Sequence, residues 1–427
     1  MKFALSPTGV RQTQRTFWII AAIAIIAWGC STVYRAGPYT LGTHTWGSKI
    51  HRTDFTVYTG SAQAVLDHTD IYAVRNPRGW AYVYPPPFAI LMVPFAWLPL
   101  FWSVMLWYAI SVAFLVSAVV LCLRLAMETT PEVDATKRII LVAAPLIVLS
   151  VWFMPGLARG QVNALLLWLT VGAVYWQRKG KSWRAGSCLA GATLLKVFPI
   201  VLLGYFIWRK HWNLALATVV MLAVLTFGAP ALVFGWQKNI DYLTEWRRVV
   251  IQPSMATETD RQNSPLCEQL ISDQKTRNQS IEPVLWRLHF EKSARPIAVA
   301  LGLGMAGLIW WIGQKSKPES ELLIVSSVFV WMLLAQPLAE SHYFILLLLP
   351  MMALVARVCS APERQIRKVA LGVWIAFFAI GLPAVNVKPL RLYGALCWLS
   401  LVLWAALLWM AWPRRNVVVL SHIKSIK

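Results

Sequence analysis

The stretch FWSVMLWYAISVAFLVSAVVLCLRL, residues 101–125, contains a single charged side chain, Arg124, close to its end. A helix needs roughly 20 apolar residues to cross the hydrocarbon core of a bilayer, and this run supplies them. Similar apolar runs, some slightly shorter, occupy residues 17–34, 139–155, 164–176, 214–234, 297–312, 322–338, 343–358, 369–385 and 392–412. The sequence therefore predicts an all-α polytopic membrane protein.

The composition and the placement of charge agree with that class. Of the 427 residues, 58% are hydrophobic and only 14% are charged. A formal net charge of +22 would suggest nucleic acid as the partner of a soluble protein. Here, however, Lys and Arg gather in short gaps between apolar runs, such as QRKGKSWR at 177–184 and RQIRK at 364–368. That pattern orients membrane helices, so the expected surroundings are membrane lipids and no nucleic acid.

The basic gaps also predict a topology. Placing them in the cytoplasm puts both termini inside and two long loops, about 35–83 and 235–295, outside. Segment 186–208 is split by Lys196 and Pro199, which favours two short re-entrant helices, and the parity of segment 85–99 stays open. We expect about ten to twelve membrane helices in one domain, 1–427, of a bacterial inner membrane, with any active site facing the periplasm or exterior.

Cysteine spacing indicates neither a disulfide framework nor a metal site. The six cysteines lie mainly in or beside apolar runs, at Cys30, Cys122, Cys188, Cys267, Cys359 and Cys397. The outer segment NIDYLTEWRRVVI, residues 239–251, has apolar residues at helical spacing and is expected to lie on the membrane surface.

Three aspartates follow the first apolar run. Asp54 precedes an amphipathic pattern that predicts a helix beginning near Thr53 or Asp54. Its carboxylate is then either an N-cap that accepts backbone N–H groups or a group kept for chemistry. Asp67 and Asp70 resemble solvated turn residues and are weaker candidates.

Further polar side chains lie within or beside the apolar runs. Ionisable groups in such places are functional candidates, and they are Lys196 in LLKVFP together with Glu340 and His342 in AESHYF. Lys196 has the alternative of extending to the headgroups, and His342 that of a satisfied interfacial histidine. Gln161 and Asn163 have the alternative of joining helices by hydrogen bonds.

These residues carry a resemblance. The chain resembles glycosyltransferase family eighty-seven, the polyprenol-phosphate-mannose-dependent mannosyltransferases that include the mycobacterial phosphatidylinositol-mannoside enzymes. The similar stretches are TDFTVYTGSAQAVLDHTDIY (53–72), YVYPPPFAILMVPFAWLP (82–99), GQVNALLLWL (160–169), LAGATLLKVFPIVLL (189–203), NQSIEPVLWRL (278–288) and SHYFILLLLP (341–350). The resemblance implies the C-type glycosyltransferase membrane fold, a polyprenyl-phosphate-linked sugar donor and a glycolipid or glycan acceptor.

The resemblance also implies site residues. Asp54 would be the catalytic base, and His342 would contact the donor phosphate or the substrate. The family often has a Trp and an acid close before the His-Tyr pair, whereas here the run is AESHYF, so the role of Glu340 stays open. The other candidate substrate-binding residues in the matching stretches are Tyr84, Gln161, Asn163, Asn278, Gln279 and Tyr343.

The residues fit that chemistry. A sugar that leaves from a lipid phosphate needs no general acid, because the phosphate is already a stable anion. One carboxylate can then deprotonate the acceptor hydroxyl while cations hold the phosphate, and the sugar inverts its configuration. The available donors are Arg159, Lys196, His342 and Arg287. No metal-ligand cluster is evident, so we expect no metal and no other cofactor.

Three other function classes remain possible at this stage. A secondary transporter would show repeated halves with interrupted segments in corresponding positions, but here both interrupted segments lie in the first half. A polysaccharide ligase that uses a diphosphate-linked polyprenol would depend on outer-loop arginines more than on Asp54. A non-catalytic membrane scaffold would leave Lys196 and His342 unexplained.

Overall fold

The computed structural model describes residues 53–76, 79–130, 134–255, 276–360 and 363–413, together with residues 12, 16, 19–20 and 23–29. Within these ranges the regular structure is helical, apart from isolated β-bridges that pair Arg75 with Ala81 and Asn278 with Glu340. Seven helices in the described part of the chain are long and apolar enough to cross a membrane. An all-helical polytopic membrane protein is therefore confirmed.

The long apolar helices follow the predicted runs closely. They are α5 (Leu100–Glu128), α6 (Ala135–Ala158), α10–η3–α11 (Trp212–Ala223, Val224–Gly228, Ala229–Phe234), α16 (Ala294–Lys315), η6–α17 (Pro318–Ser320, Glu321–Ala335), η7–α18 (Ser341–Leu347, Leu348–Ser360) and α19–η8–α20 (Arg364–Ala376, Phe377–Gly381, Leu382–Ala384). Shorter helices from the apolar runs are α7 (Asn163–Arg178), α8 (Ser182–Leu195), η2 (Phe198–Ile200), α9 (Val201–Trp208) and α22 (Ala395–Ala411). Half of the predicted first span, 17–34, lies outside the described residues, as do Cys30, Cys267 and residues 35–52 and 256–275 of the two long loops.

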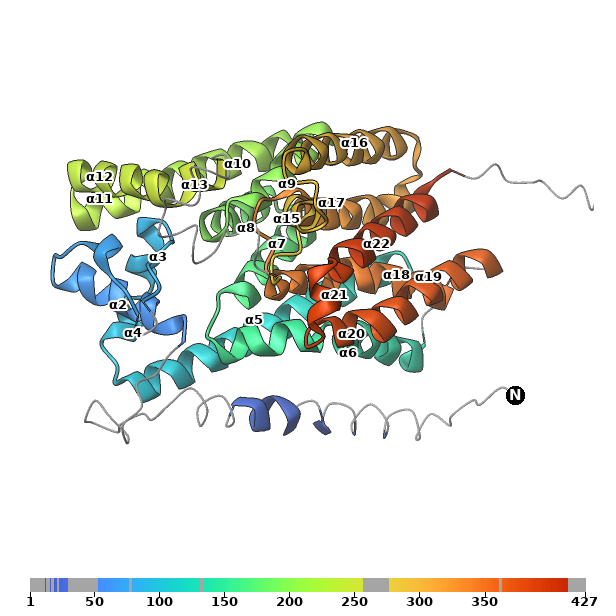
Figure 1. Cartoon of the computed structure of the whole chain (residues 1–427), viewed down its shortest axis with the longest axis horizontal. Helices are drawn as coiled ribbons and strands as arrows, with labels where there is room; N and C mark the ends of the chain where they lie inside the picture. Colours follow the sequence, from blue (N-terminus) through green and yellow to red (C-terminus); the bar gives the residue numbers. More distant parts are fainter. Residues whose placement is uncertain are drawn as a thin grey trace, which may run out of the picture.

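The remaining helices are short. They are α2 (Phe55–Leu66), η1 (Ile71–Ala73), α3 (Pro86–Leu91), α4 (Val93–Ala96), α12 (Trp236–Trp246), η4 (Arg247–Ile251), α13 (Gln252–Met255), α15 (Ile281–Arg287) and α21 (Lys388–Leu392). Because α3 and α4 are each far shorter than a membrane span, segment 85–99 does not cross as one helix. Figure 1 shows α2–α4 and α11–α13 gathered at one end of the molecule. The predicted helix over 239–251 is present as α12 and η4.

Burial separates central helices from peripheral ones. In η6–α17, 67% of the residues are buried, and in the most apolar part of η7–α18 the share is 78%. The corresponding share is only 17% for α10–α11 and 28% for α16, whose apolar side chains point outward. Figure 1 shows α17 among the other helices, between α16 and α22. A helix that is apolar on all faces belongs in the core of a membrane protein, and an apolar outward face indicates contact with lipid.

Helices α7, α8 and α10 pack closely through small residues. A Cβ atom built on Gly186 of α8 would lie 2.6 Å from Cβ of Ala217 in α10, and one on Gly172 of α7 would lie 3.3 Å from Sγ of Cys188. Small residues allow membrane helices to approach in this way. Because α8 is held on both sides, its end at Leu195 is fixed in space, and so is the residue that follows.

A proline interrupts the helix α10–η3–α11. Pro230 has no N–H group, so it cannot bond the carbonyl of Thr226 four residues earlier. The chain takes a π-helical turn over 224–228, and the Asn239 side chain donates to the Thr226 carbonyl at 3.0 Å. This bond ties α12 back onto the preceding helix. It thereby positions α12 and α13, which form one wall of the cavity described below.

Candidate active site

Asp54 stands immediately before α2, as the sequence predicts, but its side chain does not cap the helix. Among the described residues, its carboxylate makes no hydrogen bond to the first turn of α2. Instead, Gln161 Nε2 donates to Asp54 Oδ2 at 2.6 Å. Asn163 Nδ2 in turn donates to Gln161 Oε1 at 3.0 Å, which leaves the Gln161 amino group facing the carboxylate. The carboxylate is therefore aimed at the polar turn between α6 and α7.

A glycine brings that turn against α2. Gly160 has φ +67°, and a Cβ atom on it would lie 2.7 Å from Cβ of Phe55. Non-glycine residues rarely adopt this backbone conformation, and here the side chain would also collide. The Gly160 carbonyl accepts a hydrogen bond from Trp107 Nε1 at 2.7 Å, and the Trp107 ring stacks on Phe55 with centroids 5.9 Å apart. These contacts place Gln161 within reach of Asp54.

Lys196 occupies a break between two helices. Helix α8 ends at Leu195, and Lys196 has an extended backbone before η2 begins at Phe198. Its Nζ donates to Tyr343 Oη at 2.8 Å and lies 4.9 Å from the ring centroids of both Tyr343 and Tyr84. Two aromatic faces and a hydroxyl therefore hold a partly buried cation. The predicted split of segment 186–208 into two helices is present, with the break at Lys196.

Tyr84 links the lysine to α2. Its hydroxyl lies 3.1 Å from that of Tyr58, a residue of α2, and its carbonyl accepts from Tyr72 Oη at 3.0 Å. Burial raises the pKa of Tyr58 well above its usual value, so this tyrosine stays protonated. The hydroxyl pair connects the Lys196 side of the site to the helix that follows Asp54.

Glu340 directly precedes η7, and His342 is the second residue of that helix. His342 Nδ1 lies 3.3 Å from Glu340 Oε2, and both side chains are largely buried. A Cβ atom on Gly156 of α6 would lie 3.8 Å from His342 Cβ and 3.5 Å from Gln161 Oε1. The histidine is therefore close to the polar turn that holds Asp54.

The electrostatics of Glu340 show which charges share this region. Burial raises the pKa of the Glu340 carboxyl, and the Asp54 charge raises it as well. The charge of Lys196 opposes the rise most strongly, followed by those of Arg159 and Arg277. The charges of one other acid and three cations therefore reach the Glu340 carboxyl. Arg159, which directly follows α6, is one of the cations that the sequence predicted for the site.

Arg277 was not predicted from the sequence. It directly precedes the NQS motif at 278–280 and is exposed, and its charge reaches Glu340. The signal that could have found it is its position beside a motif shared with the family. Arg287, which was predicted, instead donates to the backbone carbonyls of Leu392 and Asn278 at 3.0 and 2.9 Å.

Asn278 and Gln279 join the segment before α15 to the turn that carries Glu340. Asn278 Nδ2 donates to the carbonyl of Pro337 at 2.9 Å, and Asn278 Oδ1 accepts from the backbone N–H of Ala339 at 2.9 Å. Gln279 pairs through its backbone N–H with the Ala339 carbonyl at 2.9 Å. Both residues are buried. These contacts favour positioning roles for Asn278, Gln279 and Arg287.

Asp67 and Asp70 are exposed turn residues, as predicted. Asp67 follows the last residue of α2 and accepts from Gln63 Nε2 at 2.9 Å. Asp70 caps η1 by accepting from the backbone N–H of Tyr72 at 2.9 Å. Neither bond joins either carboxylate to the residues around Asp54.

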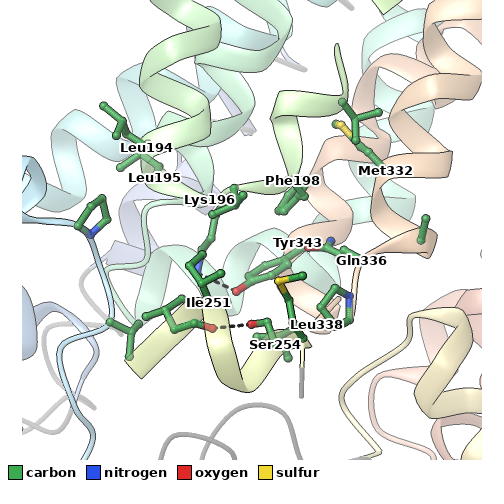
Figure 2. A pocket seen from close by; sticks show the side chains of 18 of the residues that line it. Leu194, Leu195, Lys196, Phe198, Ile251, Ser254, Met332, Gln336, Leu338 and Tyr343 are labelled. Carbon is green, nitrogen blue, oxygen red and sulfur yellow. Dashed lines mark hydrogen bonds between the residues drawn. The ribbon is translucent and has the colours of Figure 1, made fainter. Parts of the chain in front are cut away.

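An apolar cavity of about 410 Å³ adjoins Lys196. Figure 2 shows Lys196 and its hydrogen bond to Tyr343 beside the apolar side chains of Leu195, Ile251 and Met332. The walls of the cavity come from the end of α8, from η2 and α9, from the segment α12–α13, and from the end of α17. We call it the Lys196 cavity. A space of this size, mostly apolar with a few convergent polar groups, is typical of a ligand site.

Metal-ligand and cysteine chemistry are not evident in the described ranges. There, no group of three or more His, Cys, Asp and Glu side chains is arranged to hold a metal ion. The described cysteines, at Cys122, Cys188, Cys359 and Cys397, are all unpaired. The polar groups of the site are thus carboxylates, amides, phenols and cations.

Several known proteins are similar to this chain in sequence. Over 353 residues, which are 78% of this chain and 73% of the relative, it is 26% identical to a polyprenol-phosphate-mannose-dependent alpha-(1-2)-phosphatidylinositol mannoside mannosyltransferase of Mycobacterium tuberculosis. It is also 26% identical to the protein of the same description from Mycolicibacterium smegmatis, over 73% of this chain and 72% of the relative. Residues 82–337 match glycosyltransferase family 87. Because that match spans more than half of the sequence, the chain belongs to glycosyltransferase family 87.

Proposed function

We propose that this enzyme transfers a hexose, namely mannose, from a polyprenyl-phosphate donor to a hydroxyl of a glycolipid or glycan acceptor. Family membership identifies a glycosyltransferase, which argues against the transporter and scaffold alternatives. The names of the relatives supply the donor class and a phosphatidylinositol mannoside as an acceptor of those enzymes. The observation that carries the proposal is the Lys196 cavity, where a partly buried cation lies beside an apolar space.

The cavity suits such a donor for a chemical reason. A polyprenyl phosphate has a long hydrocarbon tail and an anionic head. The tail gains free energy in an apolar space, and the anion needs a cation or hydrogen-bond donors when it leaves water. Lys196 supplies a cation whose own position is fixed by Tyr343 and Tyr84. The proposal places the sugar between this lysine and Asp54.

In the proposed reaction Asp54 is the general base. The acceptor oxygen attacks the anomeric carbon, and its proton passes to the Asp54 carboxylate. The bond between that carbon and the phosphate oxygen breaks, and its electron pair stays on the phosphate. Attack on the face opposite the leaving group inverts the configuration. Lys196, His342 and Arg159 are the proposed stabilisers of the departing phosphate.

Gln161 is proposed to position the base. Its bond to Asp54 Oδ2 directs the carboxylate away from the backbone N–H groups of α2, which would otherwise hold it as a cap. Asn163 fixes the orientation of the Gln161 amide. Positioned proton acceptors contribute about 100-fold or more to such reactions, so their supporting residues matter as well.

The proposal is tested with purified protein in lipid nanodiscs. The protein is incubated with radiolabelled polyprenyl-phosphate mannose, the glucose counterpart, and a diphosphate-linked polyprenyl sugar, each with an extract of membrane lipids. Transfer from the mannose donor to a lipid is expected. Transfer from the diphosphate donor alone would support the ligase alternative, and transfer from none of them would reject the proposal.

We further propose that the site faces the outside of a bacterial inner membrane and that both termini are cytoplasmic. The motivation is the concentration of Lys and Arg in the gaps near residues 181 and 317. Single cysteines at Lys317 and Glu282, in a cysteine-free background, are labelled with an impermeant maleimide in intact cells. Labelling at 282 and protection at 317 are expected, and the reverse pattern would overturn the orientation.

A further inference from the structure

A second apolar cavity lies next to the first. It has a volume of about 370 Å³ and lies between α9, α16 and α17. Two of its lining residues, Val201 and Trp331, also line the Lys196 cavity. We call it the α9–α16 cavity. The two cavities lie on either side of this pair of side chains, and residues of α9 line both of them.

The shared wall is held in place. Trp331 Nε1 donates to the carbonyl of Gly302 in α16 at 2.9 Å, which fixes the indole between α16 and α17. On the opposite side, Gly204 of α9 lines the α9–α16 cavity, and a Cβ atom on it would meet nothing within 4 Å. Ala306 of α16 also lines it. Small side chains on two facing helices therefore keep this space open.

Polar contacts lie beyond the far end of the α9–α16 cavity. Tyr205 and Trp208 line that end, and the Tyr205 hydroxyl donates to Glu321. Arg209 pairs with the same carboxylate at 2.6 Å and lies over the Trp208 ring at 4.2 Å. From Val201 to Trp208 the helix rises about 10 Å. The two cavities thus lie between the Lys196 cation and a partly buried ion pair.

We propose that the α9–α16 cavity receives the distal isoprene units of the donor and makes the enzyme sensitive to polyprenyl chain length. The proposal rests on the function proposed above. An occupant with an anionic head and a long apolar tail matches two neighbouring apolar cavities, the first of which adjoins a cation. Gly204 and Ala306 are then specificity residues, because they determine how far the tail reaches. An acyl chain of the acceptor is the alternative occupant.

The test compares two donors that carry the same sugar on a short citronellyl phosphate and on a long undecaprenyl phosphate. The short tail stays in the Lys196 cavity, whereas the long tail enters both. Gly204→Leu and Ala306→Phe fill the α9–α16 cavity from opposite sides. Each is expected to lower kcat/KM for the long donor by about tenfold or more, the usual effect of a pocket that rejects added bulk. Rates with the short donor should stay near those of the wild type.

Gly307→Leu is the matched control. Gly307 neighbours Ala306 on α16 and is exposed, a Cβ atom on it meets nothing within 4 Å, and it lines neither cavity. This variant should keep the wild-type ratio between the two donors. Equal losses with both donors, or none in either cavity-filling variant, would overturn the inference while transfer by the wild type still upheld the proposed function. Variants that respond to acceptor acyl length instead would assign the cavity to the acceptor.

Discussion

Replacing Asp54 by Asn separates a helix cap from a catalytic base. Asparagine has the same size, caps helices as well as aspartate does, and can still accept the Gln161 bond through its amide oxygen. What is lost is the charge on that bond. Hydrogen bonds to charged groups contribute about 1 kcal/mol more to stability than neutral ones. The free energy of unfolding should therefore fall by only about that amount.

The effect on transfer should be much larger. An amide cannot take the proton of the acceptor hydroxyl, so turnover is expected to fall by about 100-fold or more. At about 1.36 kcal/mol per tenfold change, such a loss exceeds the loss of stability at least twofold. The assay measures radiolabelled sugar transferred under saturating donor, with equilibrium binding of the donor measured in parallel. Binding should remain near that of the wild type.

Asp67→Asn and Asp70→Asn are the controls, because both carboxylates are exposed and hold only local turns. Both variants should keep their activity. The reasoning fails if folded Asp54→Asn turns over at a rate near that of the wild type, since the carboxylate would then be dispensable. It also fails if the controls lose as much activity as Asp54→Asn.

Two further variants probe the surroundings of the base. Lys196→Gln should raise the donor KM by roughly tenfold or more, because a charge-assisted contact to the phosphate is lost; unchanged donor kinetics in the folded variant would make this lysine structural. Gly160→Ala and Gly180→Ala share a positive φ, near +67° and +68°, but only the first brings a Cβ atom within 2.7 Å of Phe55. Gly180→Ala should lose about 1–2 kcal/mol of stability, and Gly160→Ala should lose more because its Cβ atom also collides with Phe55. Only Gly160→Ala should also lose transfer activity, and equal activity of the two variants would contradict this.

Much of the membrane architecture could be predicted from the sequence. Hydropathy is a local property, so α5, α6 and α16 begin and end within a few residues of the predicted runs. The break at Lys196 was also predictable, because a lysine and a proline interrupt one apolar stretch. The Pro230 turn was not, since the carbonyl it frees is satisfied by Asn239 from another helix.

The candidate site was harder to predict because its geometry depends on distant residues. The sequence left Asp54 either a cap or a base, and only the fold directs its carboxylate to Gln161, which lies more than 100 positions later. Gly160 looked unremarkable in the sequence, although the approach of two segments depends on it. Arg287 was predicted from the sequence as a cation of the site, and Arg277 was not. Their difference lies in the carbonyls that surround Arg287.

The apolar walls of the Lys196 cavity affect what substrate concentration means for this enzyme. Under the proposed function, the ligand that fits among Leu195, Ile251 and Met332 is a lipid, which reaches the enzyme from the bilayer and not from water. The quantity that governs occupancy is then the mole fraction of donor among the membrane lipids. Diluting proteoliposomes with buffer should leave the rate per enzyme unchanged, whereas diluting the donor with inert phospholipid at constant volume should lower it. In a cell, the supply of donor would accordingly be set by lateral diffusion and by the lipid composition of one membrane.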